Sequence, residues 1–225
     1  MTGAVIASVD EVLTTTRAVR RRLDLTRPVP RAVVEECIEI ARQAPIAEAR
    51  EACRFVAVDD PALRARAAAV YRRATDDFVL GPMRRKADER RARGEPERPR
   101  DPRLERILAS AFHLYEHLAE VPLLILAGSV DRPPRQPLDA HASGFYGSVY
   151  PSVWSLQLAL RSRGLGSSLT CIHLHYADEM AAVLGLPEEF HQVALLPVAY
   201  TLGLRFRPAP RLPTADVLHW NGWHG

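Results

Sequence analysis

The chain has 225 residues, of which 47% are apolar, and this length and composition suit a globular protein with one core of its own. Its longest apolar run, residues 121–127, is far shorter than the roughly 18 residues of a membrane-spanning helix, and no basic leader opens the chain, so we expect a cytoplasmic protein without a membrane segment. The formal net charge is only +3 and the basic residues are almost all arginine, so the positions of single arginines matter more than their total.

The first third of the chain combines helical patterns with one strand. Val12, Leu13, Thr16 and Val19 have helical spacing, which predicts a helix over residues 9–22 with a very basic end. The patterns that follow predict, in chain order, a helix over 31–43, a buried strand over 55–58 and a helix over 61–71.

Residues 81–102 differ in composition from the rest of the chain, because they are rich in charge and proline and almost free of apolar side chains. Acidic residues alternate with the basic ones, and no aromatic residue offers a platform on which a base could stack, which argues against nucleic-acid binding. We therefore predict a charged excursion, made of an exposed helix fragment and a mobile connection, and no nucleic-acid partner.

The second half of the chain interleaves strands and helices. Its patterns predict a helix over 104–118, a strand over 121–127, a proline-rich loop over 131–142, a long buried helix over 148–163, a strand over 169–172, a helix over 178–184, a strand over 193–199 and an irregular tail from 208. The interleaving places the chain in the α/β or α+β class, and we expect residues 1–225 to form a single domain.

Two pairs of histidines raise the question of a metal. His113 and His117 lie one helical turn apart in a zinc-protease-like pattern, but the match is short and a convincing third ligand is missing. His173 and His175 would share one side of an extended strand, although ordinary packing explains them as well. Three scattered cysteines fit neither a disulfide framework nor a nucleophile. We predict no metal site.

Two arginine-rich segments, one near each end of the chain, have the composition that a phosphate clamp needs. They are TRAVRRR at residues 16–22 and PRLP at residues 210–213. The glycine-rich GLGSS at residues 164–168 is not a dinucleotide loop, because it follows a predicted helix and does not precede one.

In this order, the segments resemble the FMN-dependent nitroreductase family from residue 14 to residue 223. The resemblance is carried by TTRAVRRRLDLTRPVP, YGSVYPSVWSLQLALRSRGLGSSLT, VLGLPEEFHQVALLPVAY and APRLPTADVLHWNGW. It implies an α+β fold, with a central mixed β-sheet flanked by helices, in an intertwined homodimer with two FMN sites at its interface. The tail at 205–225 is then expected to wrap the partner subunit.

Site residues follow from the same resemblance. It implies that Arg17 and Arg20 bind the FMN phosphate and ribityl chain, and that Arg211 closes on the phosphate from the tail. Ala18 stands where the family usually has serine. The family pattern further places these residues at the cofactor: Pro45, Ser168, Leu169 and Thr170.

The chemistry implied by the resemblance is carried by the flavin, so no side chain is assigned a catalytic role. NADH or NADPH would supply hydride, and a small organic acceptor such as a nitroaromatic, quinone or enone would take two electrons. The protein would position the reactants and supply positive potential near the reduced flavin.

The chain departs from the family pattern in the loop at residues 46–53. The Ser, Gly and Asn of the relatives are replaced here without a change in length, and Glu48 and Glu51 would bring negative charge to the flavin unless Arg50 compensates. Three possibilities stay open: a working oxidoreductase with an altered loop, a catalytically weak FMN-binding or sequestering protein, and a member that has lost FMN and binds another ligand in the dimer groove.

Overall fold

A computed structural model describes residues 5–6, 8–47, 50–95, 101–131 and 140–223. Its centre is a four-stranded sheet in the order β1-β2-β4-β3, in which every neighbouring pair of strands is antiparallel. The strands are β1 (Cys53–Val58), β2 (Leu123–Ser129), β3 (Leu165–Ser167) and β4 (His191–Tyr200). Among the described residues, parallel pairing occurs in one isolated bridge, between Ala18 and Ser167.

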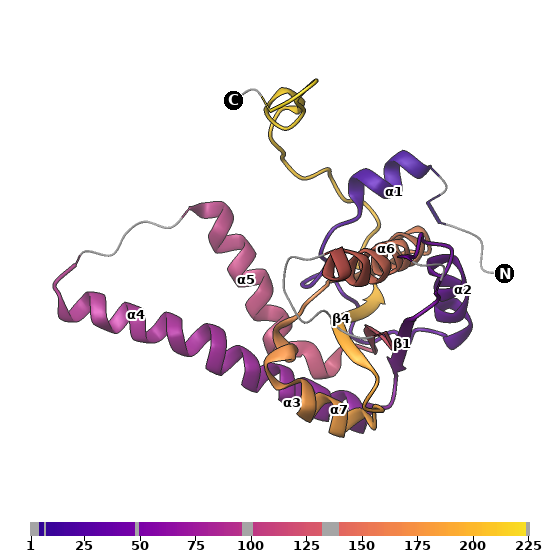
Figure 1. Cartoon of the computed structure of the whole chain (residues 1–225). Coiled ribbons are helices and arrows are strands. Elements are labelled where there is room, and N and C mark those ends of the chain that lie inside the picture. The colour runs from indigo at the N-terminus through magenta and orange to yellow at the C-terminus, as the bar shows by residue number, and fades with distance from the viewer. Residues whose placement is uncertain (1–4, 7, 48–49, 96–100, 132–139, 224–225) are drawn as a thin grey trace.

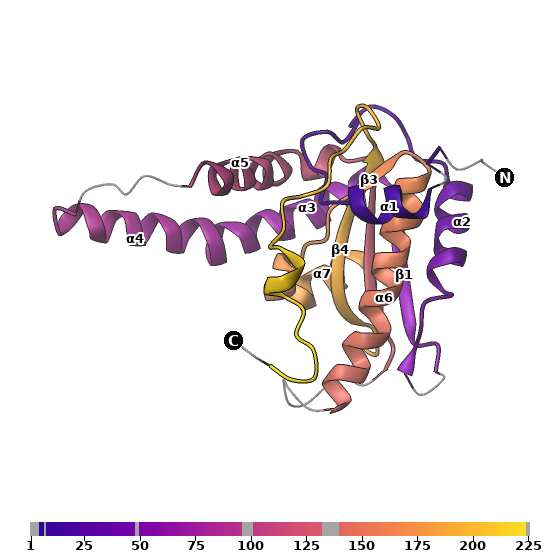
Figure 2. The ribbon, with the colours of Figure 1, turned by 90° about the horizontal axis from the view of Figure 1, so that it is seen from above.

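Helices cover both faces of this sheet (Figure 2). One face packs on α2 (Arg31–Ala41) and α6 (Ala140–Ser162), and the other on α3 (Pro61–Thr75) and α7 (Ala177–Leu184). Successive residues of a strand point to opposite faces, so Ile125 belongs to the first core and Leu126 to the second. All seven residues of β2 are therefore buried, which is why its sequence is a continuous apolar run.

An arm of two helices projects from this body in both views (Figures 1 and 2). A π-helical turn at Asp76–Leu80 joins α3 to α4 (Gly81–Ala92), and α5 (Pro102–His117) returns to the sheet. None of the described residues of α4 is buried. The charged excursion predicted at 81–102 is thus an exposed helix followed by a connection, whose residues 96–100 lie outside the described part of the chain.

The first predicted helix is too long. Helix α1 spans only Val9–Thr15, because Thr16 adopts an extended backbone conformation with ψ near 128°. The hydroxyl groups of Thr14, Thr15 and Thr16 each donate to the carbonyl four residues earlier, and such β-branched residues favour a helix weakly. The basic residues that follow therefore lie on a segment that starts extended and bends into a turn at residues 20–22.

The strand predicted at residues 169–172 is also wrong. The paired residues are Leu165–Ser167, after Gly164 ends α6 with a φ of +77°. Only Thr170 still makes an isolated bridge, to Leu195. Residues Ile172–Tyr176 then form a 3₁₀ helix, so His173 and His175 do not share one side of a strand.

The remaining predicted elements exist, with shifted bounds. Helix α3 continues beyond residue 71, α6 begins at Ala140 inside the predicted loop, and residues 132–139 lie outside the described part. Short 3₁₀ helices at Leu118–Glu120 and Thr214–Asp216 complete the elements, and the C-terminal tail is otherwise irregular. The predicted combination of helices with a central sheet is confirmed.

Candidate functional site

The arginine-rich N-terminal segment lies along the edge of β3. The backbone N–H of Val19 donates to the carbonyl of Ser167 at 2.8 Å. This approach depends on Gly166, because a Cβ there would lie 2.9 Å from Cβ of Val19 and 2.7 Å from Cγ2 of Thr201. Because residues 17–20 follow the sheet edge, Arg17 and Arg20 are held by backbone pairing and not by a helix.

Three arginine side chains hold the start of the C-terminal tail against this segment. The guanidinium of Arg22 donates to the carbonyls of residues 202, 203 and 205 at 2.7–3.0 Å and lies over the Phe206 ring. Arg161, which is buried at the end of α6, donates to the carbonyl of Leu204 at 2.7 Å. Arg17 donates to the carbonyl of Arg207 at the same distance. The two ends of the chain are thereby joined.

A cleft of about 880 Å³ opens between the joined ends and α5. Six arginines and no acidic residue are among the described residues that line it, and the arginines are Arg17, Arg20, Arg103, Arg106, Arg207 and Arg211. None of the six forms an ion pair with a carboxylate in the described part of the molecule. Such a site attracts phosphate or carboxylate groups, which a guanidinium can bind through two parallel hydrogen bonds.

The structure brings four of the sequence-predicted site residues to this cleft: Arg17, Ala18 and Arg20 from the N-terminal segment and Arg211 from the tail. Sequence reasoning missed Arg103 and Arg106. They lie three residues apart on α5, whose apolar and polar faces the sequence does show, and this spacing puts both on one face. That face meets the cleft only through the folding of the arm, which local sequence does not reveal.

The other predicted residues do not line the cleft. Ser168, Leu169 and Thr170 follow β3 directly, and Pro45 lies on the exposed turn after α2. Ser168 is fully buried, and its hydroxyl has no hydrogen-bond partner among the described residues. A buried hydroxyl without a partner is costly, so this position would gain from a ligand that carries a donor or an acceptor.

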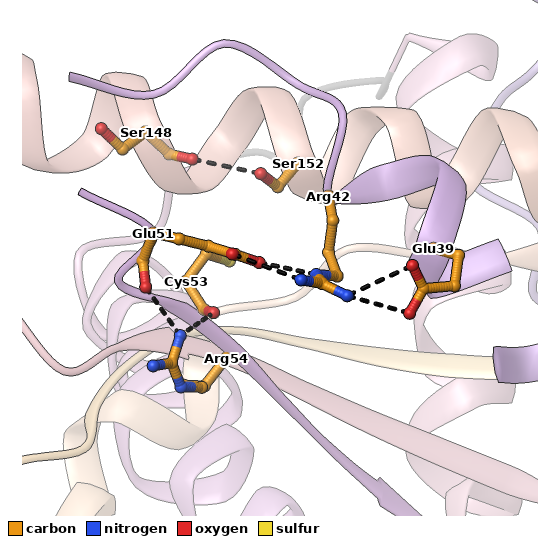
Figure 3. A network of polar contacts seen from close by, with 7 residues as sticks. All are labelled: Glu39, Arg42, Glu51, Cys53, Arg54, Ser148 and Ser152. Atoms are coloured by element: carbon orange, nitrogen blue, oxygen red, sulfur yellow. Dashed lines mark hydrogen bonds and ion pairs between the residues drawn. The ribbon is translucent and has the colours of Figure 1, made fainter. Parts of the chain in front are cut away.

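The divergent loop at 46–53 is bonded to the body of the protein on both sides (Figure 3). Glu51 forms an ion pair with Arg42 at 2.6 Å, and Arg42 also bonds Glu39. Arg50 instead pairs with Asp131, so the charge of Glu51 is balanced by Arg42 and not by Arg50. Arg42 can reach Glu51 because it lies at the C-terminal end of α2, next to the loop. Glu48 lies outside the described residues.

The loop also contacts α6. The backbone N–H of Ala47 donates to the hydroxyl of Ser148 at 2.8 Å, and Ser148 in turn donates to the carbonyl of Gly144. After the loop, Arg54 donates to the carbonyls of Glu51 and Cys53 (Figure 3). These bonds replace the local turn chemistry that glycine and asparagine would supply. The described residues of the loop are therefore held by side chains at the end of α2, on α6 and on β1.

Comparison with known proteins agrees with this arrangement. The sequence model described as "Nitroreductase family" matches residues 13–200, which is most of the chain. The chain belongs to the nitroreductase family. Both the N-terminal segment of the cleft and α5 lie within the match, whereas Arg207 and Arg211 lie beyond it.

Solved structures share the fold of this nitroreductase-family chain at low sequence identity. Oxidised iodotyrosine deiodinase, bound to FMN and 3-iodo-L-tyrosine, is 22% identical with a TM-score of 0.67 over 96% of this chain and all of that one. The FMN- and NADPH-dependent nitroreductase NfnB from Sphigopyxis sp. strain HMH is 20% identical with a TM-score of 0.66 and the same coverage. A BluB-like flavoprotein from Clostridium difficile 630 is 15% identical with a TM-score of 0.70, again over 96% of this chain and all of that one.

Several cysteines and histidines outside the cleft of this family member are buried, half-buried or engaged in contacts. Burial raises the pKa of both Cys37 and Cys53 to about 11, so their thiols are neutral and poor nucleophiles near pH 7. His173 is fully buried, which lowers its pKa to about 4, and His175 stacks on Phe78 at a centroid distance of 3.8 Å. His117 bonds Glu120.

The described residues contain neither a metal-binding cluster nor a membrane-spanning helix. No group of three or more His, Cys, Asp or Glu side chains is arranged to hold a metal ion. Within the same residues, every helix is too short or too polar to cross a bilayer.

Proposed function

We propose that the protein is an FMN-dependent oxidoreductase that transfers two electrons from NADH or NADPH to a small organic acceptor of the nitroaromatic, quinone or enone type. The observation that carries this proposal is the cleft in which Arg17 and Arg20, from one end of the chain, meet Arg211 from the other. Membership of the nitroreductase family and the shared fold with FMN-containing neighbours support it.

The residues of the cleft fit the phosphate end of the cofactor. A phosphate monoester carries about two negative charges at neutral pH and three acceptor oxygens. Arg17 and Arg20 come from a segment fixed by backbone pairing, and Arg211 comes from a tail fixed by Arg22 and Arg161, so the guanidinium groups reach the cleft from two separate segments. Ala18 also lines the cleft and offers no hydroxyl, so guanidinium groups carry this contact.

The residues after β3 fit the ring end of the cofactor. Ser168 has a buried hydroxyl without a partner, and Leu169 and Thr170 continue from it along the sheet edge. We assign these three residues to the polar edge of the isoalloxazine ring. Pro45 would border the ring from the loop, and the charge of Glu51 is already balanced by Arg42 there.

When bound, FMN accepts hydride from the nicotinamide and passes two electrons to the acceptor. The chain's own residues bind and orient the reactants and stabilise negative charge, because the cleft concentrates guanidinium groups without carboxylates. No described side chain is assigned as a general acid or base.

A homodimer completes the proposal. Helix α6 leaves Tyr146, Tyr150 and Trp154 about 40% exposed, and Trp220 and Trp223 of the tail are 74% and 82% exposed. Large aromatic side chains gathered on an outer helix and on a tail that leaves the body are typical of protein–protein interfaces. We assign both to contact with a second copy of the chain.

An absorbance spectrum of the purified protein tests the function. We expect flavin bands that bleach on addition of NADH or NADPH without oxygen and return on addition of a nitroaromatic or quinone. If the flavin bands do not bleach, the protein binds flavin but does not accept electrons from NADH or NADPH. A colourless protein that stays colourless after incubation with excess FMN would end the proposal.

A further inference from the structure

The cleft holds more positive charge than one FMN phosphate can balance. Six arginines line it, and a phosphate monoester neutralises about two charges at neutral pH. The arginines are not balanced from within, because no acidic residue is among the described lining residues. In a site of this kind the remaining positive potential draws a second anion toward the same opening.

The unassigned charge is concentrated on α5. Arg103 and Arg106 lie on one face in the first turns of the helix, together with Ile107 and Ser110, which also line the cleft. Neither guanidinium group has a hydrogen bond or ion pair in the described part of the chain, whereas the guanidinium of Arg17 already donates to the tail. Asp101 caps the helix by accepting from its backbone and does not line the cleft.

We propose that Arg103 and Arg106 form a second anion subsite, which binds a phosphate or carboxylate group on the reactant that meets the cofactor. This inference rests on the proposed function and deepens it, since it states that the electron donor or the acceptor is itself anionic. The shared chemistry has two sources, the 2′-phosphate of NADPH and a carboxylate on the acceptor, which an experiment separates.

The cleft also has the size and surface for such a reactant. Its volume of about 880 Å³ is near the upper end of the roughly 300–1,000 Å³ of small-molecule sites. Trp154 and Leu13 line it beside the arginines, so a flat ring can pack on apolar surface while its charged group reaches α5. A neutral substrate would leave Arg103 and Arg106 without a counterpart.

Calorimetric titration of the purified full-length protein, saturated with FMN, tests the subsite. The charged probes are adenosine 2′,5′-bisphosphate and 4-nitrobenzoate, and their matched counterparts without the extra charge are 5′-AMP and nitrobenzene. The variant combines Arg103→Gln with Arg106→Gln. The control combines Arg84→Gln with Arg85→Gln, which removes the same charge from exposed residues of α4 outside the cleft.

We expect at least one charged probe to bind the unaltered protein more tightly than its counterpart. The Arg103/Arg106 variant should lose about tenfold or more of that affinity, as expected when a charge-assisted pair is removed, while its FMN content and the control stay unchanged. Preference for the bisphosphate would identify NADPH as the source of the anion, and preference for 4-nitrobenzoate would identify the acceptor.

Three results would overturn the subsite. If each charged probe binds no more tightly than its counterpart without the extra charge, the chain has no second anion subsite. If the Arg103/Arg106 and Arg84/Arg85 variants lose equal affinity for the charged probes, the preference comes from the overall positive charge of the protein and not from a subsite on α5. Loss of FMN from the Arg103/Arg106 variant would place both arginines in the phosphate clamp. If the unaltered protein binds no FMN, the proposed function fails, but the same titrations on the colourless protein still decide whether the subsite exists.

Discussion

The substitution Arg22→Met removes the side chain that fastens the tail to the N-terminal segment. The guanidinium makes four hydrogen bonds to carbonyls of residues 202, 203 and 205, and it lies 4.2 Å from the centroid of Phe206. A hydrogen bond from a charged donor contributes about 1.5–3 kcal/mol, but these are exposed to solvent and are better taken at about 0.5–1 kcal/mol each. Methionine keeps most of the packing on Phe206.

We therefore expect the free energy of unfolding of Arg22→Met to fall by roughly 2–4 kcal/mol, which lowers the melting temperature of a chain of this size by about 4–16 °C. FMN affinity should fall as well, by no more than it falls in Arg211→Ala, since freeing the tail removes the contact that Arg211 makes. Urea unfolding and flavin fluorescence titration measure the two effects. Arg21→Met, an exposed neighbour, is the control. Unchanged stability in Arg22→Met would refute the fastening role.

Three further predictions concern the scaffold. Gly166→Val should lower the free energy of unfolding by about 1–3 kcal/mol and weaken FMN binding, because the new side chain would displace Val19. The control Gly147→Ala should change neither quantity, because the space around its Cβ is open. If urea unfolding shows Gly166→Val to be as stable as the unaltered protein, the segment is not closely packed at Gly166. Because the pKa of buried His173 is about 4 and that of an unfolded histidine is about 6.5, unfolding takes up a proton between these values. The free energy of unfolding should therefore fall by roughly 3 kcal/mol as the pH drops from 6.5 to 4, and a His173→Leu variant with the same pH slope would contradict this. Cys37 and Cys53, with pKa values near 11, should react with iodoacetamide at pH 8 far more slowly in the folded protein than in urea, and comparable rates would show that their burial is overstated.

The sequence predicted the elements whose periodicity reflects burial. The apolar run at 121–127 supplies most of the central strand β2, whose two faces are both covered, and the helix predicted at 148–163 is the C-terminal part of α6. The predictions failed for segments whose backbone conformation is not set by the burial of an apolar face. Three consecutive threonines end α1 at residue 15, and the histidines of 173–175 lie in a 3₁₀ helix because the chain leaves β4 after Thr170.

The candidate site shows the same division. Arg17, Arg20 and Arg211 were selected by motif, and the fold brings them to one cleft. The bonds that do this, from Arg22 and Arg161 to backbone carbonyls of the tail, carry no local sequence signal because any residue has a carbonyl. The ion pair between Glu51 and Arg42 could not be predicted from the sequence either, since it depends on the direction in which α2 ends.

The most direct test of the account compares FMN dissociation constants of the unaltered protein, Arg211→Ala and Arg66→Ala. Arg66 is an exposed arginine of α3 outside the cleft, so its substitution removes the same charge at a distance. We predict a dissociation constant raised roughly tenfold or more in Arg211→Ala and unchanged in Arg66→Ala, because only the former loses a charge-assisted pair with the phosphate. Equal affinity in all three proteins would contradict the claim that both ends of the chain bind one phosphate.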